Sequence, residues 1–403
     1  MLIAGQLLLE SDSVRCRLSP GYIRIEDEII VEVVEGQVPK QCDLGGADHI
    51  ITPGFIDAHL HLPQFDIVGG HGMPLLQWLN EITFPSERRW GDVDFARSMT
   101  MRVLTQCIGY GTTSICAYAT VHHASANAAI ELATSLGIGG TIGQVLMDRN
   151  APDYLCRQAN ELIDQCAATI DRFPPHLRMS AAVTPRFAIS CTPDLLDASG
   201  RLAQQRGVIV QTHLAETTAE CNLVAELFDN QTYVNVYKNA GLLTPRTIFG
   251  HGIYLDEQDR TQVASGGSMI AHCPTANSFL RSGTMNRSAL VKDQVKLLLG
   301  SDIGAGYERS MVRVGRAMIE AASSLGECFP SAAEAWHCIT AGNADRLGFS
   351  DRGRLRIGNT ADLVVIAPDI PLAVSTVDPL STLMFAWDDR WIQNVLVCGR
   401  KSQ

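Results

Sequence analysis

Short apolar runs alternate with longer helix-like stretches over most of this chain. The runs occupy residues 54–58, 112–117, 141–146, 180–184, 208–211, 247–249, 268–271 and 297–299. Between them apolar residues recur at intervals of three and four, as in residues 95–111 and 152–173. Strands that alternate with helices indicate a parallel sheet, because parallel neighbours need a long crossover connection. Eight such units over about 300 residues predict an α/β fold, a (β/α)₈ TIM-type barrel.

A doubly wound open sheet is the alternative to the barrel, but no G-x-G-x-x-G follows the first run. The two ends of the chain have a different pattern of apolar and polar residues. Residues 22–36 alternate apolar and charged residues, and residues 362–368 and 391–400 read as strands. We therefore expect residues 1–52 and 353–403 to form the two parts of a small β-sandwich domain. The barrel, residues 53–352, would be inserted between them.

Charge and cysteine content narrow the class of function. The formal net charge is −11 with no long Lys/Arg run, which argues against nucleic-acid or anionic-membrane partners. No segment has the length of a transmembrane helix, and the first ten residues lack the basic region of a signal peptide. The twelve cysteines form no C-x-x-C pair and sit among apolar residues. We expect reduced thiols, a cytoplasmic protein and a small-molecule partner.

Polar side chains follow six of the eight apolar runs, at the point where each predicted strand ends. In a barrel these ends converge on one face, where active sites are built. Ionisable groups are costly at such buried positions unless they are paired or bound to a metal. Their repeated placement therefore predicts a site on that face. The residues are His59, His61, Gln64, Arg186, Phe187, His213, Glu216, His251, His272 and Asp302.

Two histidines one residue apart end the first run. Alternate side chains of a strand point to the same face, so His59 and His61 are presented together. With His213 and Asp302 they supply three imidazoles and one carboxylate, which suits Zn²⁺ with a position left for water. Fe²⁺ also fits this set. Residues 180–187 supply no lysine to bridge a second ion, so we expect one metal per chain.

Several motifs in the same order resemble the amidohydrolase superfamily, and within it the guanine deaminases. They are HLHLPQ, ITFPSE, GYGTTS, TPRF, QTHLAE, AHCPTANSFLRSG and GSDIGAG, followed by the GNTADLVV stretch of the tail. The resemblance covers essentially the whole chain. The sequence departs from the family pattern at Ala215 and Thr217, and at Tyr307 and Glu308. These positions border the expected pocket, so they affect substrate detail more than metal chemistry.

The resemblance implies hydrolytic deamination of guanine to xanthine and ammonia by a metal-activated water, in a homodimer. Glu216 is expected to shuttle protons, Asp302 to bind the metal and orient or deprotonate the water, and His251 to contact the water or the oxyanion. Arg186 carries only donors and prefers an acceptor edge such as guanine O6/N7. Gln64 can donate and accept, Phe187 can stack on the ring, and Glu216 also contacts substrate.

Three questions stay open at this level. The substrate could instead be a related amino-heterocycle, such as a pterin, 8-oxoguanine or a triazine, or the chain could be a non-catalytic scaffold. His272 has a packing role or a site role with equal support, and His122 and His123 fit a loop better than a site. Residues 82–90 fit a lid over the pocket or a surface loop.

Overall fold

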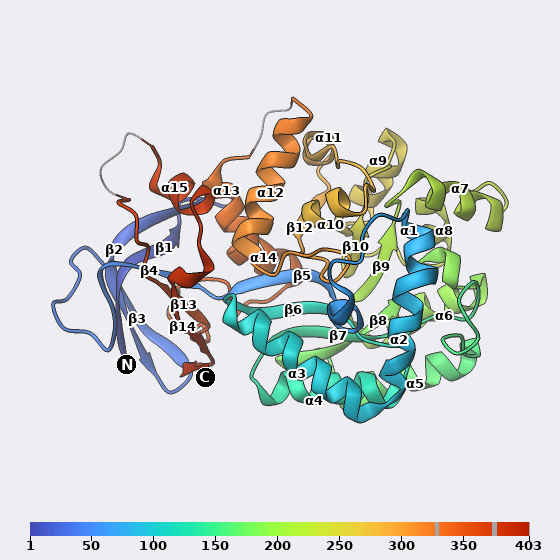
Figure 1. The fold of residues 1–403 in the computed structure, drawn as a ribbon, viewed down its shortest axis with the longest axis horizontal. Helices are drawn as coiled ribbons and strands as arrows, with labels where there is room; N and C mark the ends of the chain where they lie inside the picture. Colours follow the sequence, from blue (N-terminus) through green and yellow to red (C-terminus); the bar gives the residue numbers. More distant parts are fainter. Residues whose placement is uncertain (327–329, 373–376, 403) are drawn as a thin grey trace.

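Two sheets organise the protein, which we describe from a computed structural model covering residues 1–326, 330–372 and 377–402 (Figure 1). The larger sheet has eight strands, all parallel, in the order β12-β11-β10-β9-β8-β7-β6-β5. Each of the eight predicted runs overlaps one of these strands, which confirms the (β/α)₈ barrel. The strands are β5 (Phe55–His61), β6 (Thr112–Tyr118), β7 (Gly139–Leu146), β8 (Met179–Pro185), β9 (Val210–Leu214), β10 (Thr247–His251), β11 (Met269–His272) and β12 (Lys296–Leu299).

Helices surround this sheet and connect its strands (Figure 1). The first ones, before β8, are α1 (Leu75–Trp78), α2 (Phe84–Arg88), α3 (Val93–Gly109), α4 (His123–Ser135) and α5 (Ala159–Arg172). After it come α6 (Pro193–Arg206), α7 (Thr218–Leu227), α8 (Tyr233–Asn239), α9 (Glu257–Ser265), α10 (Pro274–Phe279), α11 (Arg287–Lys292), α12 (Met311–Ser324), α13 (Ala332–His337) and α14 (Asn343–Leu347). Of the predicted stretch 152–173, only the part from Ala159 is helical.

Local chemistry sets the ends of these helices. Helix α6 begins where the Thr192 hydroxyl accepts a hydrogen bond from the Leu195 amide, with Pro193 at the first helical position. It ends at Gly207, whose φ of 63° is favourable only for a residue without a side chain. Helix α7 begins with a capping box between Thr217 and Glu220. That cap lies directly after β9 and matters for the site described below.

The barrel is closed between its first and last strands by a side chain. Nδ2 of Asn343 donates to the carbonyl oxygens of Ile56 (2.8 Å) and Leu299 (2.9 Å), and its Oδ1 accepts from the Leu299 amide (3.0 Å). Beyond the strand ends, the Asp302 amide donates to the His59 carbonyl at 2.8 Å. These bonds satisfy buried backbone groups that would otherwise be orphaned. They also hold the residues after β12 against β5.

The second sheet is built from both ends of the chain and lies beside the barrel (Figure 1). Its order is β15-β14-β13-β4-β1-β2-β3, with β1 and β4 parallel and the other pairs antiparallel. The Ile30 amide on β3 donates to the carbonyl of Asn359, which precedes β13, at 2.9 Å, and the sheet has an apolar core of its own. Its strands are β1 (Leu2–Glu10), β2 (Cys16–Glu26), β3 (Ile29–Glu35), β4 (Leu44–Pro53), β13 (Leu363–Ile366), β14 (Ile392–Val397) and β15 (Arg400–Lys401). Helix α15 (Pro379–Phe385) lies in the connection before β14.

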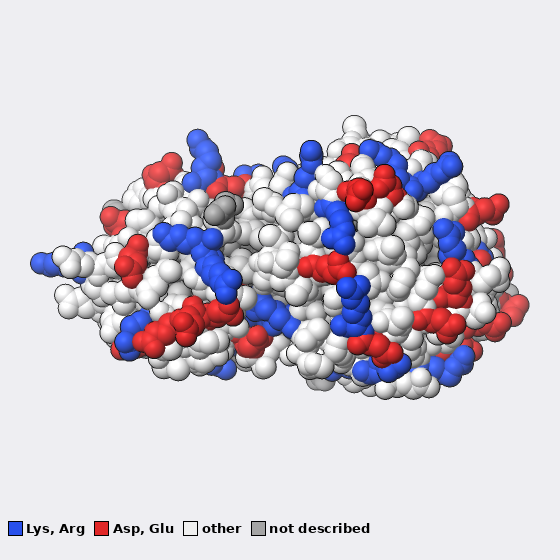
Figure 2. Space-filling model, turned by 90° about the horizontal axis from the view of Figure 1, so that it is seen from below, with Lys and Arg blue, Asp and Glu red and all other residues white. Residues whose placement is uncertain are grey.

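The distribution of charged side chains on the surface agrees with the sequence, which has no long Lys/Arg run. On the face drawn in Figure 2, Lys and Arg side chains are interspersed with Asp and Glu rather than gathered into a basic patch. Among the described residues, no helix combines the length and the apolar character that crossing a membrane requires. Among them too, the cysteines are free thiols, most of them buried, as predicted.

Candidate active site

The carboxyl ends of the barrel strands enclose a cavity of about 380 Å³. Most of the residues predicted at strand ends line it: His61, Gln64, Arg186, Phe187, His213, Glu216, His251 and Asp302. His59 lies beside it, within the same group of histidines. Because parallel strands end on the same side of a sheet, residues up to 243 positions apart in the sequence become neighbours here.

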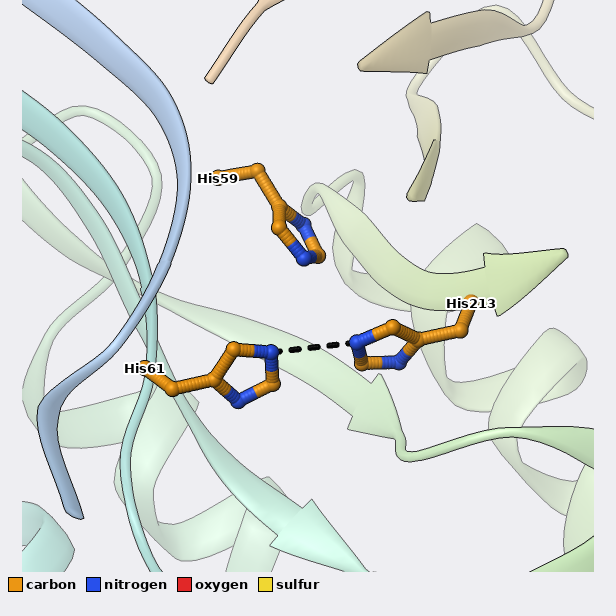
Figure 3. A group of neighbouring side chains, drawn as sticks. All are labelled: His59, His61 and His213. Atoms are coloured by element: carbon orange, nitrogen blue, oxygen red, sulfur yellow. Dashed lines mark hydrogen bonds between the residues drawn. The ribbon is translucent and has the colours of Figure 1, made fainter. Parts of the chain in front are cut away.

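Three imidazoles point toward one another at the base of this cavity (Figure 3). The Nε2 atoms of His61 and His213 are 3.0 Å apart, and the ring of His59 lies beside both. Asp302 completes the group, with one carboxylate oxygen 3.5 Å from Nε2 of His59 and 3.4 Å from Nε2 of His61. The side chains of His59, His61 and Asp302 are almost completely buried, and that of His213 is partly exposed.

The protonation states of this group follow from burial and from one hydrogen bond. Burial and the neighbouring positive charges lower the pKa of each of the three histidines well below its ordinary value, so the rings are neutral. Nδ1 of His213 lies 2.7 Å from the Arg186 carbonyl, an oxygen that can only accept. His213 therefore carries its proton on Nδ1 and presents a free lone pair from Nε2. Burial raises the pKa of Asp302 to about 6.

This arrangement fits a divalent cation. Nε2 of His59 is buried without a hydrogen-bond partner in the described part of the chain, and it lies near the Nε2 atoms of His61 and His213, which are 3.0 Å apart. Unsatisfied buried groups are costly, and several lone pairs facing one point are favourable only around a positive charge. Three imidazole nitrogens and one carboxylate are the donor set expected for Zn²⁺ or Fe²⁺. His59, His61, His213 and Asp302 could therefore hold one metal ion.

A second pair of ionisable groups lies beside this donor set. Nε2 of His251 is 3.3 Å from Oε2 of Glu216 and 3.7 Å from Oδ2 of Asp302. Its Nδ1 lies 2.8 Å from Oδ1 of Asn277, which fixes the ring. Burial lowers the pKa of His251, but the carboxylates of Glu216 and Asp302 outweigh that effect and raise it above its ordinary value. Burial likewise raises the pKa of Glu216.

Hydrogen bonds hold Glu216 in place. Its Oε1 accepts from the Ser282 hydroxyl at 2.6 Å, and its backbone amide donates to Oε2 of Glu220 at 2.8 Å. The preceding residue, Ala215, has φ of 48°, and His251 and Asp302 also have positive φ, at 70° and 51°. Such conformations cost on the order of 1–3 kcal/mol each for residues other than glycine, so they persist only where surrounding contacts enforce them. Three of them within one site point to a functional constraint.

The outer part of the cavity combines apolar walls with polar groups. Leu75, Trp78 and Leu79 form one wall, and Phe187 and Leu280 also line it. Arg186 and Gln64 supply the polar groups, and both are almost completely buried. Sequence reasoning missed the first three wall residues, which belong to no recognisable motif. It also gave no role to Ser282 or Glu87, although both lie within quoted motifs.

Residues 82–90, for which a lid and a surface loop were both considered, are helical rather than a loop. They run through a π-helical turn, α2 and a 3-10 turn, and Trp90 is fully buried. The two arginines of this segment face outward, with Arg88 over the ring of Tyr154 and Arg89 paired with Asp66. Glu87 instead points inward to Arg186. Residues 82–90 are not among the residues that line the cavity, but Glu87 contacts Arg186, which does line it.

The remaining histidines lie apart from the cavity. His272 is buried, with both ring nitrogens unpartnered among the described residues, and it lines a separate cavity of about 690 Å³ with Thr275 and Asn277. His123 begins α4, and its ring contacts Gln144. Neither His122 nor His123 lines the active-site cavity, but His123 belongs to α4 and not to the loop that was predicted for both.

Comparison with known proteins identifies the family to which the chain belongs. Residues 50–401 match the amidohydrolase family. The chain is 37% identical over 362 residues to the guanine deaminase of Escherichia coli (strain K12), covering 87% of this chain and 82% of that protein. The solved structure of the E. coli guanine deaminase superposes with a TM-score of 0.93 at 33% identity, covering 100% of this chain and 99% of that one.

A second solved structure agrees with the first. It is the guanine deaminase of C. acetobutylicum with guanine bound in its active site, which gives a TM-score of 0.93 at 28% identity and covers 100% of this chain and 99% of that one. Family match, sequence identity and fold similarity each extend over most of the chain. The chain therefore belongs to the amidohydrolase family and, within it, to the guanine deaminases.

Proposed function

We propose that this guanine deaminase hydrolyses guanine to xanthine and ammonia in the cavity at the carboxyl ends of its barrel strands, with His59, His61, His213 and Asp302 holding one Zn²⁺ per chain. The observation that carries the proposal is the convergence of three neutral imidazoles and one carboxylate on one buried point, next to a second carboxylate. Fe²⁺ would be held by the same side chains. A metal held there would act as a Lewis acid and lower the pKa of a water molecule to about 7.

Glu216 moves the protons in this proposal. Hydrolysis adds a water at C2 of guanine, places a proton on the ring nitrogen and another on the departing amine, and releases ammonia. Burial raises the pKa of Glu216, which favours the protonated carboxyl group and suits it to accept a proton and pass it on. The Ser282 hydroxyl bond keeps the carboxyl oriented toward the cavity.

Asp302 and His251 act on the attacking water in this proposal. Asp302 orients the water and accepts a proton from it, since its carboxylate reaches both the histidine group and His251. The carboxylates of Glu216 and Asp302 raise the pKa of His251 and so favour its protonated ring, which would donate a hydrogen bond to the water oxygen as that oxygen bonds to C2.

Arg186, Gln64, Phe187 and Glu216 bind the purine. Arg186 can only donate, so it favours a base edge with acceptors, as guanine has at O6 and N7 and adenine has not. Phe187 lines the cavity and would stack on the ring. The guanine bound to the related C. acetobutylicum enzyme supports a purine base as the ligand.

Three further parts of the proposal concern the whole protein. The two sheets support a division into residues 1–52, 53–352 and 353–403, with the first and last forming one domain. The free, mostly buried thiols suit a cytoplasmic protein. We further propose a homodimer, which light scattering on the purified protein would test.

A substrate panel tests the activity directly. Ammonia release and xanthine formation are measured with guanine, adenine, cytosine, a pterin, 8-oxoguanine and an amino-triazine. We expect guanine to have the highest kcat/KM and adenine and cytosine to release no ammonia. A higher kcat/KM for one of the other heterocycles would assign the site to that substrate, and no release from any compound would indicate a non-catalytic scaffold.

A further inference from the structure

Glu87 is a buried carboxylate to which the mechanism above gives no role. It lies on α2, exposes only 1% of its surface, and belongs to a segment remote in sequence from the barrel strand ends. Both of its oxygens lie 2.8 Å from the same nitrogen, Nη1 of Arg186. One of them also accepts a hydrogen bond from Nε2 of Gln64 at 3.3 Å. Glu87 thus contacts both polar side chains that we propose for binding the purine.

These bonds determine which atoms remain for a ligand. With Nη1 engaged by Glu87, Arg186 keeps Nη2 and Nε, and neither of these donates to another side chain or carbonyl among the described residues. The side-chain amide nitrogen of Gln64 donates to Glu87, which leaves its Oε1 as the atom available to a ligand. That oxygen is buried and has no partner in the described part of the chain. The cavity is therefore presented with donors from Arg186 and an acceptor from Gln64.

A second contact from the same helical turn restrains Arg186. Phe84 and Glu87 are three residues apart on α2 and so lie on the same face. The guanidinium carbon of Arg186 lies 5.3 Å from the centre of the Phe84 ring. The guanidinium is held by a charge at one nitrogen and by an aromatic ring at its side.

We propose that Glu87 is a positioning residue for substrate recognition: it orients Arg186 and Gln64 so that they present adjacent donor and acceptor groups to the purine. This inference rests on the proposed roles of Arg186 and Gln64 in binding. It identifies the recognised edge as one that offers an acceptor beside an N–H donor, which guanine has at O6 and N1–H. Without Glu87, the Gln64 amide would be free to turn and present its donor instead.

A purely structural ion pair is the competing explanation, because a buried arginine needs a counter-charge wherever it lies. The protein contains a matched case. Asp362, whose side chain is almost fully buried, accepts a hydrogen bond from Nη2 of Arg178 at 2.5 Å, and neither residue lines the active-site cavity. Substitution there removes a buried ion pair but leaves the purine-binding groups untouched.

The test measures kcat and KM for guanine, together with Tm, in five variants of the full-length, metal-loaded protein: Glu87→Gln, Glu87→Asp, Arg186→Ala, the double variant Glu87→Gln/Arg186→Ala, and Asp362→Asn. The Glu87→Gln substitution places a neutral amide opposite the donors of Arg186 and Gln64. We expect it to lower kcat/KM by about 10- to 100-fold, mainly through KM, as for loss of a charged hydrogen bond. Asp362→Asn should lower Tm without changing KM.

Two comparisons decide the matter. If Glu87 acts through Arg186, the double variant has the kcat/KM of Arg186→Ala alone, because the two effects are not additive. We expect the Tm of the double variant to exceed that of Arg186→Ala, which leaves the Glu87 carboxylate without its cationic partner. Glu87→Asp keeps the negative charge, so its kcat/KM should lie between those of the unmodified protein and Glu87→Gln. If Glu87→Gln does not fold, KM is compared between Glu87→Asp and the unmodified protein instead.

The contrary outcomes separate the two proposals. Normal KM in Glu87→Gln or Glu87→Asp, beside an impaired Arg186→Ala, overturns the positioning role and leaves Arg186 in the site. Losses that multiply in the double variant also overturn it. An unchanged kcat/KM in Arg186→Ala removes Arg186 from substrate binding, and the inference on Glu87 falls with it.

Discussion

Nε2 of His251 and Oε2 of Glu216 lie 3.3 Å apart in a part of the barrel from which water is almost excluded. His251 ends β10 and Glu216 follows β9, so neighbouring strands bring them together. Each stabilises the charge of the other: Glu216 raises the pKa of His251, and His251 opposes the effect of burial on the pKa of Glu216. The pair can therefore share a proton beside the histidine group, as the deamination chemistry requires.

Glu216→Gln should remove proton transfer without disturbing the metal ligands. We expect kcat for guanine to fall by roughly 10²- to 10⁴-fold, the usual contribution of a positioned acid–base group. Metal content, measured by elemental analysis, should stay as in the unmodified protein. Glu226→Gln, at an exposed position on α7, serves as the control and should leave kcat unchanged. Near-normal kcat in Glu216→Gln would remove this residue from the chemistry.

Removal of the metal should abolish turnover reversibly. We expect elemental analysis to find about one Zn or Fe per chain, in keeping with a single set of four ligands. Treatment with a chelator should eliminate xanthine formation, and adding back Zn²⁺ or Fe²⁺ should restore it. A chain that turns over guanine at full rate with no metal would contradict the proposed site.

Two histidine variants localise the metal. His213→Ala removes one member of the buried group and should lose most of the bound metal. His272→Ala removes a buried imidazole that lines a different cavity, and should retain the metal. Equal metal content in the two variants, measured after identical dialysis, would show that the ion is held elsewhere.

The stability of the protein should depend on the ionisation of Glu220. Burial raises the pKa of this carboxyl from its ordinary value of 4.5 to about 7, although the Tyr233 hydroxyl bond opposes the shift. Between these two values the folded state binds the proton more tightly than the unfolded state, so this contribution to stability is lost as pH rises from 4.5 to 7.

Glu220→Gln cannot ionise and provides the comparison. Relative to this variant, the unmodified protein should lose on the order of 3 kcal/mol in free energy of unfolding over that pH range. Urea unfolding at several pH values, with metal present throughout, measures the difference. Glu226→Gln, at an exposed position on the same helix, is measured as the control. A difference between wild type and Glu220→Gln that is constant with pH would show that folding does not raise the pKa of Glu220.

Asn343→Ala should destabilise the closure of the barrel. The substitution leaves the Leu299 amide and the carbonyls of Leu299 and Ile56 without their buried partner. We expect a loss of about 2–4 kcal/mol in free energy of unfolding, measured by urea denaturation. Asn239→Ala, at an exposed position on α8, is the matched control and should change stability by less than about 0.5 kcal/mol. Equal stability of the two variants would mean that the strand ends close without this side chain.

Much of this protein could be read from local patterns. The predicted run 141–146 lies in a strand that is buried along its whole length, because a parallel barrel strand is covered on both faces. Short runs of this kind mark strands without any tertiary information. The placement of His59 and His61 on one face follows from the period of a strand alone. The motifs after successive strands then predicted which side chains meet, because every barrel strand ends on the same side.

Other features depend on contacts between segments far apart in the chain, and only the tertiary structure decided them. Nothing local to residues 82–90 shows that Glu87 turns inward to Arg186, 99 positions away, while Arg88 turns outward. The same holds for Asn343, which joins two strands without belonging to either. His272 follows a strand just as His213 does, but it faces a different cavity. Which side of a wall a side chain faces is set by packing among all the elements, and packing has no local period in the sequence.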